Sequence, residues 1–303
     1  MGTVRRMVAS KLGLSPSPQM VLGYVLSGFW RAYERDWMPV LRLSRITIFP
    51  IKSCDGLSLD DVRVLGGGAL ANDRRFALRD AQGRAINAKA NAAIHLLRAT
   101  FTPDAAEVAI LSARDGRRDV FRLPSDVHRL ADWLSEFFQQ RVMVVEDPRG
   151  GFPDDVDSPG PTVVSRQTLA EVAGWFGGLP LDEVRDRFRA NLEIEGDAPF
   201  CEDRLVADAR RVVRFAIGEV IFEGVTPCQR CIVPTRHPQT GEVTPQFARQ
   251  FAERRAATRP AGTITERFDH YYRLSVNTRL SPLSAGGTIR VGDEVSLGEA
   301  VPA

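Results

Sequence analysis

Hydrophobic and polar positions alternate in short runs along the first part of the chain. Such runs predict half-buried β-strands, and their regular spacing is typical of a barrel or a sandwich. The runs are Leu41–Phe49, Leu57–Leu65, Phe76–Arg79, Ile94–Phe101, Val108–Leu111 and Val120–Leu123. Asp115-Gly116 between the last two runs is a strong hairpin signal. Residues from about 41 to 123 are therefore predicted to be all-β.

The spacing of apolar residues changes to a helical period at three places. A helix is predicted after Ser125 or Asp126, with four apolar residues on one face, and others over Ser165–Phe176 and Thr244–Thr258. Further strands are predicted between and after these helices. They are Arg141–Glu146, Phe188–Gly196, Val212–Ile217, Glu219–Phe222, Tyr271–Val276 and Thr288–Leu297. The fold class is therefore mostly β with a few helices (α+β).

The length of 303 residues suggests about two domains. The best boundary is the loop Asp147–Pro161, which is rich in Gly, Pro and Asp. We expect an N-terminal extension over residues 1–40, a first domain over 41–150 and a second over 151–303.

The N-terminal extension carries a basic stretch, Met1–Lys11, and then an uncharged one, Leu12–Trp30. Its apolar core, Met20–Trp30, is about half as long as a membrane span. This pattern favours a short helix that docks on the protein or makes peripheral contact with a membrane through residues 20–30.

The amino-acid composition is that of an ordinary globular protein and excludes few classes of function. Hydrophobic residues make up 44% and charged residues 26%, and the net charge is +2, so nothing calls for a nucleic-acid partner. Only three of the 40 basic residues are lysines, which are Lys11, Lys52 and Lys89. Four cysteines in a chain of this length do not form a disulfide framework, so a reducing, cytoplasmic location fits best.

The stretch Gly224–Gly241 holds Cys228 and Cys231 at C-x-x-C spacing and is predicted to be an ordered loop. Two thiols at this spacing suit a redox pair, half of a zinc site, or a single thiolate ligand beside a bystander. Buried thiols without a role are the plain alternative. The four histidines show no metal-binding spacing, and the distant Cys201 or His237 would complete a poor zinc set.

Polar and basic residues recur at the ends of predicted strands. Lys52 and Ser53 follow the first strand, and Arg74 precedes another. Arg189 and Asn191 are two positions apart, so in a strand they point to one side. These residues suit an anionic ligand, and the alternative for each is a solvated surface position. Asp157-Ser158 in the boundary loop is a weaker candidate.

Taken in order, these motifs resemble the MOSC superfamily, in the branch with an N-terminal β-barrel domain that includes the mitochondrial amidoxime reducing component and its bacterial relatives. The resemblance covers roughly Leu41 to Leu297. Its carriers are Phe49–Gly56, Asp73-Arg74, Phe188–Asn191, Cys228–Gly241 and Gly287–Val295. It implies a β-barrel-like MOSC N-terminal domain followed by a β-barrel MOSC domain with flanking helices.

The resemblance also implies the site. The second cysteine of the motif, Cys231, is expected to ligate molybdenum and to be the catalytic residue, and Cys228 is not a ligand. The pyranopterin of the molybdenum cofactor (Mo-molybdopterin) and its phosphate are expected between the two domains. The residues expected to bind them are Lys52, Ser53, Arg74, Arg189 and Asn191, with Asp157 and Ser158 less securely aligned.

The activity implied by the resemblance is that of a molybdenum-dependent oxidoreductase that reduces the N–O bond of a small N-hydroxylated substrate. Electrons are expected from a separate donor, which is a ferredoxin, an iron–sulfur reductase or a cytochrome. Two alternatives stay open. One is a sulfur carrier or cofactor carrier that uses Cys231, and the other is a non-enzymatic module that binds a different anion. The chain departs from the family pattern at Pro234, His237 and Gln239, which flank the expected metal ligand.

Overall fold

The computed structural model describes residues 41–303. The predictions for the N-terminal extension, including the membrane contact through residues 20–30, therefore lie outside the described residues. Within residues 41–303, no helix combines the length and the apolar character needed to cross a membrane.

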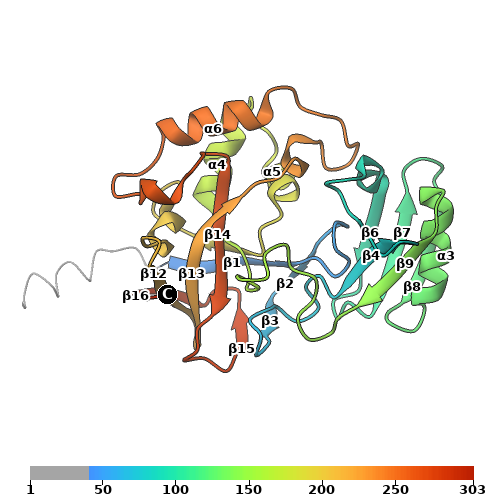
Figure 1. The fold of residues 1–303 in the computed structure, drawn as a ribbon, viewed down its shortest axis with the longest axis horizontal. Helices are drawn as coiled ribbons and strands as arrows, with labels where there is room; N and C mark the ends of the chain where they lie inside the picture. The colour runs from blue at the N-terminus through green and yellow to red at the C-terminus, as the bar shows by residue number, and fades with distance from the viewer. Residues whose placement is uncertain (1–40) are drawn as a thin grey trace, which may run out of the picture. The chain divides into compact units, whose positions relative to one another are not determined.

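Seven strands close into a barrel (Figure 1). In spatial order they are β1 (Leu41–Ile48), β11 (Leu192–Glu195), β10 (Val163–Ser165), β14 (Arg273–Leu280), β13 (Val220–Gln229), β12 (Arg211–Ile217) and β16 (Glu294–Pro302). The ring closes because β1 pairs antiparallel with β11 on one side and with β16 on the other. β2 (Leu57–Leu59) adds to the free part of β1, and β3 (Asp61–Val64) pairs with β15 (Gly287–Arg290).

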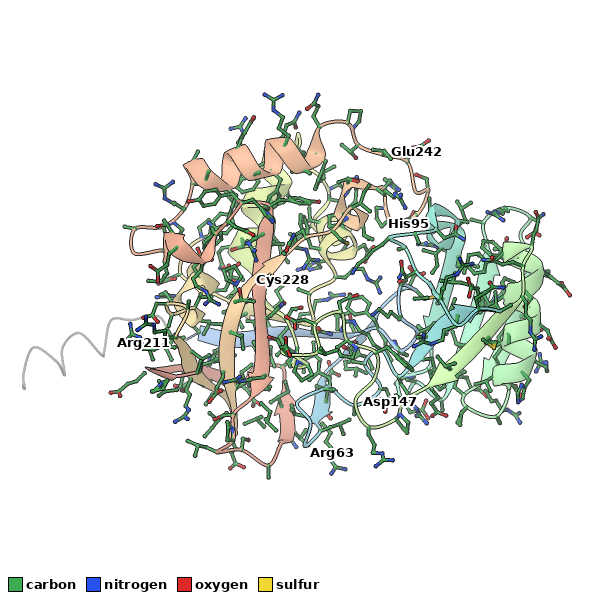
Figure 2. The ribbon with its side chains drawn as sticks, in the orientation of Figure 1. Arg63, His95, Asp147, Arg211, Cys228 and Glu242 are labelled. Carbon is green, nitrogen blue, oxygen red and sulfur yellow. The ribbon has the colours of Figure 1, made fainter. Side chains whose placement is uncertain are left out.

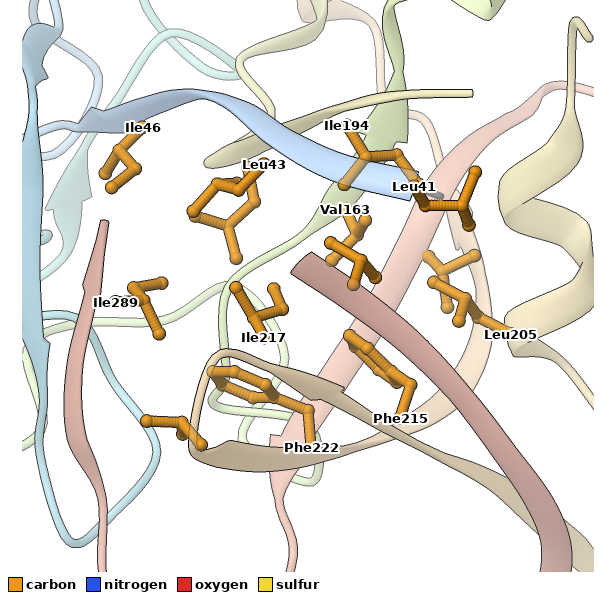
Figure 3. Packing of buried hydrophobic residues seen from close by; sticks show 14 of the residues in the cluster. Leu41, Leu43, Ile46, Val163, Ile194, Leu205, Phe215, Ile217, Phe222 and Ile289 are labelled. Carbon is orange, nitrogen blue, oxygen red and sulfur yellow. The ribbon is translucent and has the colours of Figure 1, made fainter. Parts of the chain in front are cut away.

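The barrel is filled by aliphatic and aromatic side chains from all sides (Figure 3). In β1, Leu41 and Leu43 are buried, and the next buried residues are Ile46 and Ile48. The shift in this alternation coincides with an irregularity in the pairing between Leu43 and Arg45. One extra residue there keeps the apolar side chains of both ends of the strand inside the barrel.

The first half of the described chain builds a second core from two small antiparallel sheets and one helix. One sheet is β5 (Ala85–Ile86), β4 (Phe76–Asp80) and β9 (Val142–Glu146), and the other is β6 (Leu97–Phe101), β7 (Glu107–Ser112) and β8 (Arg118–Arg122). The helix α3 (Val127–Phe138) packs against β9 and β8 and buries Leu130, Leu134 and Phe137, as its spacing predicts. Gly116 has a φ of 73° in the turn between β7 and β8, so the predicted hairpin is confirmed.

Three helices pack on the barrel and enclose a third core (Figure 1). They are α4 (Arg166–Trp175), α5 (Leu181–Phe188) and α6 (Phe247–Ala257). The 3₁₀-helices are η1 (Ala92–Leu96), η2 (Cys201–Leu205), η3 (Val233–Thr235) and η4 (Thr265–Arg267). Aromatic rings fill the space between the three α-helices, with Phe176 and Phe188 against Phe247 and with Phe188 against Phe251.

The predicted fold class, mostly β with two β-rich halves and flanking helices, is confirmed. The structure adds that β1 belongs to the barrel of the second half. The barrel therefore draws strands from both sides of the expected boundary, and the division into 41–150 and 151–303 stays a prediction.

Two local predictions are wrong. The strand predicted over Phe188–Gly196 is the end of α5 followed by β11, which begins only at Leu192. The stretch Gly224–Gly241 is not all loop, because β13 continues to Gln229. Its pairing with β14 is irregular between Pro227 and Gln229, and an irregular step tolerates a proline, which has no N–H to donate.

Candidate functional site

A cavity of about 650 Å³ opens between the barrel, the helix α5 and the sheets of the first half. Its wall includes Lys52, Ser53, Arg74, Ser158, Arg189, Asn191 and Cys231. These residues come from five separate stretches of the chain. Seven of the eight residues expected at the site therefore meet in one cavity.

Two of the four cysteines lie at this cavity. Cys228 is at the end of β13 (Figure 2) and Cys231 is in the turn before η3, and both are partly exposed. Cys54 and Cys201 are buried. Burial, reinforced by Asp55, raises the pKa of the Cys54 thiol to about 12, so this thiol of the Lys52–Cys54 turn stays protonated. The thiols open to a ligand are thus those of the C-x-x-C motif.

Two arginines, of which Arg187 is buried and Arg230 is partly exposed, hold the turn that carries Cys231. Arg187, in the last turn of α5, is 4% exposed and donates to the carbonyl oxygen of Pro234 at 2.9 Å. It also binds Glu183 at 2.8 and 2.9 Å and Thr244 at 3.1 Å. Arg230 donates to the Cys228 sulfur at 3.1 Å and to the carbonyl oxygen of Phe188. Cys231 is therefore presented on a turn fixed against the end of α5.

Two guanidinium groups share the face of one aromatic ring. The Cζ atoms of Arg189 and Arg74 lie 4.0 and 5.6 Å from the centroid of the Phe49 ring. Arg189 adopts left-handed backbone geometry (φ 53°, ψ 44°) where α5 ends, which turns its side chain into the cavity. Burial and the neighbouring charge of Arg74 lower the pKa of Arg189. Within residues 41–303 its guanidinium has no hydrogen-bond acceptor and no ion-pair partner, so it is available to an anion.

Arg74 is also in the cavity wall, but its guanidinium already has an ion-pair partner in the protein. It pairs with Asp73, and burial of its guanidinium is outweighed by Asp73 and Asp154, so its pKa is raised. The next residue, Arg75, is not in the cavity wall, and its Nε donates to Glu146 at 2.8 Å. Only one of the two adjacent arginines faces the site, and the cause is a turn, because both residues precede β4 and Arg74 has a φ of 49°.

Asn191 lines the cavity as a structural link. It is 1% exposed, and its Nδ2 donates to the carbonyl oxygen of Thr47 at 3.1 Å. Its Oδ1 accepts from the backbone N–H and the hydroxyl of Thr162 at 3.2 and 3.3 Å, and from Arg74 at 3.4 Å. The amide therefore joins β1, the start of β10 and Arg74. The strand geometry expected for Arg189 and Asn191 is absent, and a left-handed turn brings both residues to the cavity.

The two serines present hydroxyl groups. The Ser53 oxygen accepts the backbone N–H of Ala88 at 3.3 Å, which leaves its proton for another acceptor. Ser158 is 5% exposed, and in the described part of the chain its hydroxyl has no partner. Its neighbour Asp157 is exposed and is not part of the cavity wall.

Lys52 is held by the stretch that links the two halves, here called the connecting segment (residues 147–161). The Lys52 ammonium donates to the carbonyl oxygens of Phe152 and Pro153 at 2.9 and 3.3 Å and pairs with Asp154 at 3.1 Å. Asp154 also pairs with Lys89 at 3.2 Å. Lys89 and Asp154 were not expected at the site from the sequence, although the scarcity of lysine was a signal that could have pointed to Lys89.

The residues present fit a molybdenum cofactor. A thiolate is a soft ligand that suits a transition metal, and Cys231 is a partly exposed cysteine at the cavity. A phosphate needs cations and hydroxyl donors, which Arg189, Ser53 and Ser158 provide without losing a protein ion pair. Among the described residues, no cluster of three or more His, Cys, Asp or Glu side chains could hold a metal ion.

Comparison with known protein families gives two matches in chain order. Residues 40–131 match the MOSC N-terminal beta barrel domain, and residues 162–296 match the MOSC domain. The YUAD protein from Bacillus subtilis aligns with 85% of this chain and 95% of its own, with a TM-score of 0.40 and 12% identity.

Curated relatives include proteins named molybdenum cofactor sulfurase. The one from Drosophila ananassae is 26% identical over 277 residues, which is 82% of this chain, and the one from Drosophila melanogaster is 26% identical over 232 residues, which is 68%. The chain spans about a third of the length of these relatives (34% and 29%). Since both domain models match in order over most of its length, the chain belongs to the MOSC superfamily, in the branch with an N-terminal β-barrel domain.

Proposed function

We propose that this protein binds a molybdenum cofactor in the cavity and reduces the N–O bond of small N-hydroxylated molecules. The observation that carries the proposal is the meeting of a partly exposed thiol, Cys231, with the guanidinium of Arg189, which has no ion-pair partner among the described residues, in one cavity of about 650 Å³. A soft ligand beside a free cation is the combination that a metal bound to a phosphorylated organic group requires.

Different residues would bind different parts of the cofactor. Cys231 would ligate the metal, and Lys52, Arg189 and Arg74 would neutralise the phosphate, with Ser53 and Ser158 donating hydrogen bonds. Asn191 would keep Arg74 in place through its own hydrogen bond, since its polar atoms are taken by the protein. Arg187 would fix the turn of Cys231 through the Pro234 carbonyl oxygen.

The proposed reaction converts an N-hydroxy group, two electrons and two protons into the N–H compound and water. The cofactor would supply the two-electron chemistry, as cofactors do in such enzymes, and the chain would orient and enclose it. We propose that the electrons come from a separate iron–sulfur or haem protein. The volume of the cavity, about 650 Å³, would limit the substrate to a small molecule.

The test is turnover by protein produced in a host that makes the cofactor. A reduced viologen dye serves as electron source and an aryl amidoxime as substrate, and amidine formation is followed together with dye oxidation. We expect turnover by the native protein and by Cys228→Ala, and none by Cys231→Ala. A native protein that carries molybdenum and yet reduces no amidoxime, hydroxylamine or hydroxamic acid would sink this activity.

A second candidate function is supported by the relatives named molybdenum cofactor sulfurase. In this alternative the Cys231 thiol accepts the terminal sulfur of a donor persulfide, which becomes a thiol while Cys231 becomes a persulfide. Incubation with a cysteine desulfurase and cysteine would then add one sulfur atom to the intact mass. The gain would be absent in Cys231→Ala, and the dye assay would show no turnover.

A further inference from the structure

Both lysines in the described part of the chain bind the same carboxylate. Asp154 Oδ1 lies 3.1 Å from Lys52 Nζ and 3.2 Å from Lys89 Nζ. The sequence uses arginine almost everywhere else, with three lysines among 40 basic residues. Two of these uncommon side chains therefore converge on one oxygen atom in the wall of the cavity.

Three oxygen atoms surround the Lys52 ammonium. It donates hydrogen bonds to the carbonyl oxygens of Phe152 and Pro153, and the carboxylate of Asp154 is its ion-pair partner at 3.1 Å. All three belong to the connecting segment. A ligand phosphate that binds Lys52 competes with these oxygens, and the carboxylate is the one that resembles it in charge.

Asp154 lies between two points that hold the connecting segment, because the Phe152 N–H donates to the carbonyl oxygen of Arg74 at 2.9 Å and Asn277 donates to Asp155 at 3.0 Å. The segment is also held at both ends. At one end the Asp147 N–H donates to the carbonyl oxygen of Arg75, and at the other the Gly160 N–H donates to that of Thr278, both at 2.9 Å. Between them the Asp154 side chain is 53% exposed, and Val156 is 79% exposed. Ion pairs exposed to this degree are weak and are easily exchanged.

Lysine suits such an exchange better than arginine. Its ammonium is a compact point charge on a flexible stem, whereas the planar fork of arginine favours one fixed, bidentate partner. The Asp154 carboxyl stays ionised and therefore competes fully for the lysines. Burial opposes its ionisation, but Lys52, Lys89 and Arg74 outweigh burial and hold its pKa below the usual range.

We propose that the Asp154 carboxylate occupies the binding site of a ligand phosphate when no phosphate is bound. On this proposal a phosphate group binds Lys52 and Lys89, displaces the Asp154 carboxylate and thereby loosens residues 152–156 of the connecting segment. The proposal rests on the proposed function for the source of the phosphate, which is the cofactor, and it adds Lys89 to the residues that bind it. The mobility of the connecting segment then depends on whether phosphate is bound.

The experiment uses full-length protein from a host that cannot make the cofactor, with inorganic phosphate as the probe. Binding is measured by calorimetry, and hydrogen exchange is followed in peptides that cover residues 147–161. We expect Asp154→Asn to bind phosphate about fivefold more tightly than the native protein. Lys89→Met should bind it more weakly, and phosphate should speed exchange at residues 152–156 of the native protein.

The matched control is Asp132→Asn, which makes the same charge change at an exposed position on α3. It should bind phosphate as the native protein does. Equal affinity of Asp154→Asn and the native protein, or exchange at residues 152–156 that phosphate leaves unchanged or slows, overturns the proposal. Because Asp154 is half exposed, Asp154→Asn is expected to fold, and unchanged exchange in the barrel peptides verifies this.

Protein loaded with the cofactor separates the source of the phosphate from the existence of the site. There inorganic phosphate should no longer speed exchange, because the phosphate of the cofactor already occupies the lysines. An unchanged response in loaded protein assigns the same site to free phosphate. Molybdenum content is measured separately, so a protein without molybdenum contradicts the proposed function while the phosphate experiment still decides the role of Asp154.

Discussion

The Glu202 carboxyl, in the core under α4, makes the stability of the fold depend on pH. It is 1% exposed, and its Oε2 accepts a hydrogen bond from Thr168 at 2.8 Å, while its Oε1 has no hydrogen-bond partner among residues 41–303. Burial, with the nearby charge of Asp203, raises its pKa from 4.5 to about 7. We therefore predict that Glu202→Gln, which removes the titration and keeps the shape, makes the folded state less sensitive to pH.

The sign and size of the change in stability with pH follow from the difference between the pKa of Glu202 in the folded and the unfolded state. A carboxyl with a raised pKa in the folded state contributes stability that is fully present below pH 4.5 and is lost as pH rises through about 7. At about 1.4 kcal/mol per pH unit, the whole interval is worth about 3 kcal/mol, of which about 2.5 kcal/mol falls between pH 5 and pH 8. Glu202→Gln should therefore gain about 2.5 kcal/mol relative to the native protein over this range.

The assay is urea unfolding of both proteins at several pH values between 5 and 8. Other groups also titrate in this range, but their effects cancel in the difference between the two proteins. Glu299→Gln, at an exposed position on β16, is the control and should follow the native curve. If the native and Glu202→Gln curves run parallel from pH 5 to pH 8, the reasoning about the buried carboxyl is wrong.

Two further predictions concern the turn of Cys231 and the connecting segment. Arg187→Met should lower the free energy of unfolding by about 3 kcal/mol, because it leaves the Glu183 carboxylate without its buried partner. It should also speed alkylation of Cys231 by iodoacetamide, because the contact with the Pro234 carbonyl oxygen is lost. An unchanged alkylation rate would contradict the role given to that contact. Gly151→Ala should cost about 2 kcal/mol in urea unfolding, because Gly151 has a φ of 64° and a Cβ atom would lie 2.5 Å from the Asp73 carbonyl oxygen. Gly174→Ala on α4, where a Cβ atom meets nothing within 4 Å, should instead be neutral or stabilising.

The sequence predicted most strands because alternation is a local signal, but it could not predict how they close. The pairing of β1 with β16 joins Leu41 to Val295, and nothing in either strand alone specifies that partner. The helix α5 was missed because it is short and highly charged, and its apolar residues Leu181, Val184 and Phe188 were too few to give a clear helical period.

The candidate site was predictable as a set of residues and less so as a geometry. The motifs named seven residues that share the cavity, yet the reason that Arg189 faces it is a left-handed turn and not strand alternation. The contact of Lys52 with the Phe152 carbonyl oxygen spans a separation of 100 residues, so no local pattern could reveal it. Asp157 was expected only from a less secure alignment with the family pattern, and it lies exposed in the connecting segment.

The central claim is that one sulfur atom anchors the metal, and molybdenum content tests it most directly. Native protein, Cys231→Ala and Cys228→Ala are purified from the same cofactor-producing host and analysed by elemental mass spectrometry. The account predicts molybdenum near one atom per chain in the native protein and in Cys228→Ala, and its loss in Cys231→Ala. Metal-free native protein, or full molybdenum in Cys231→Ala, would contradict it.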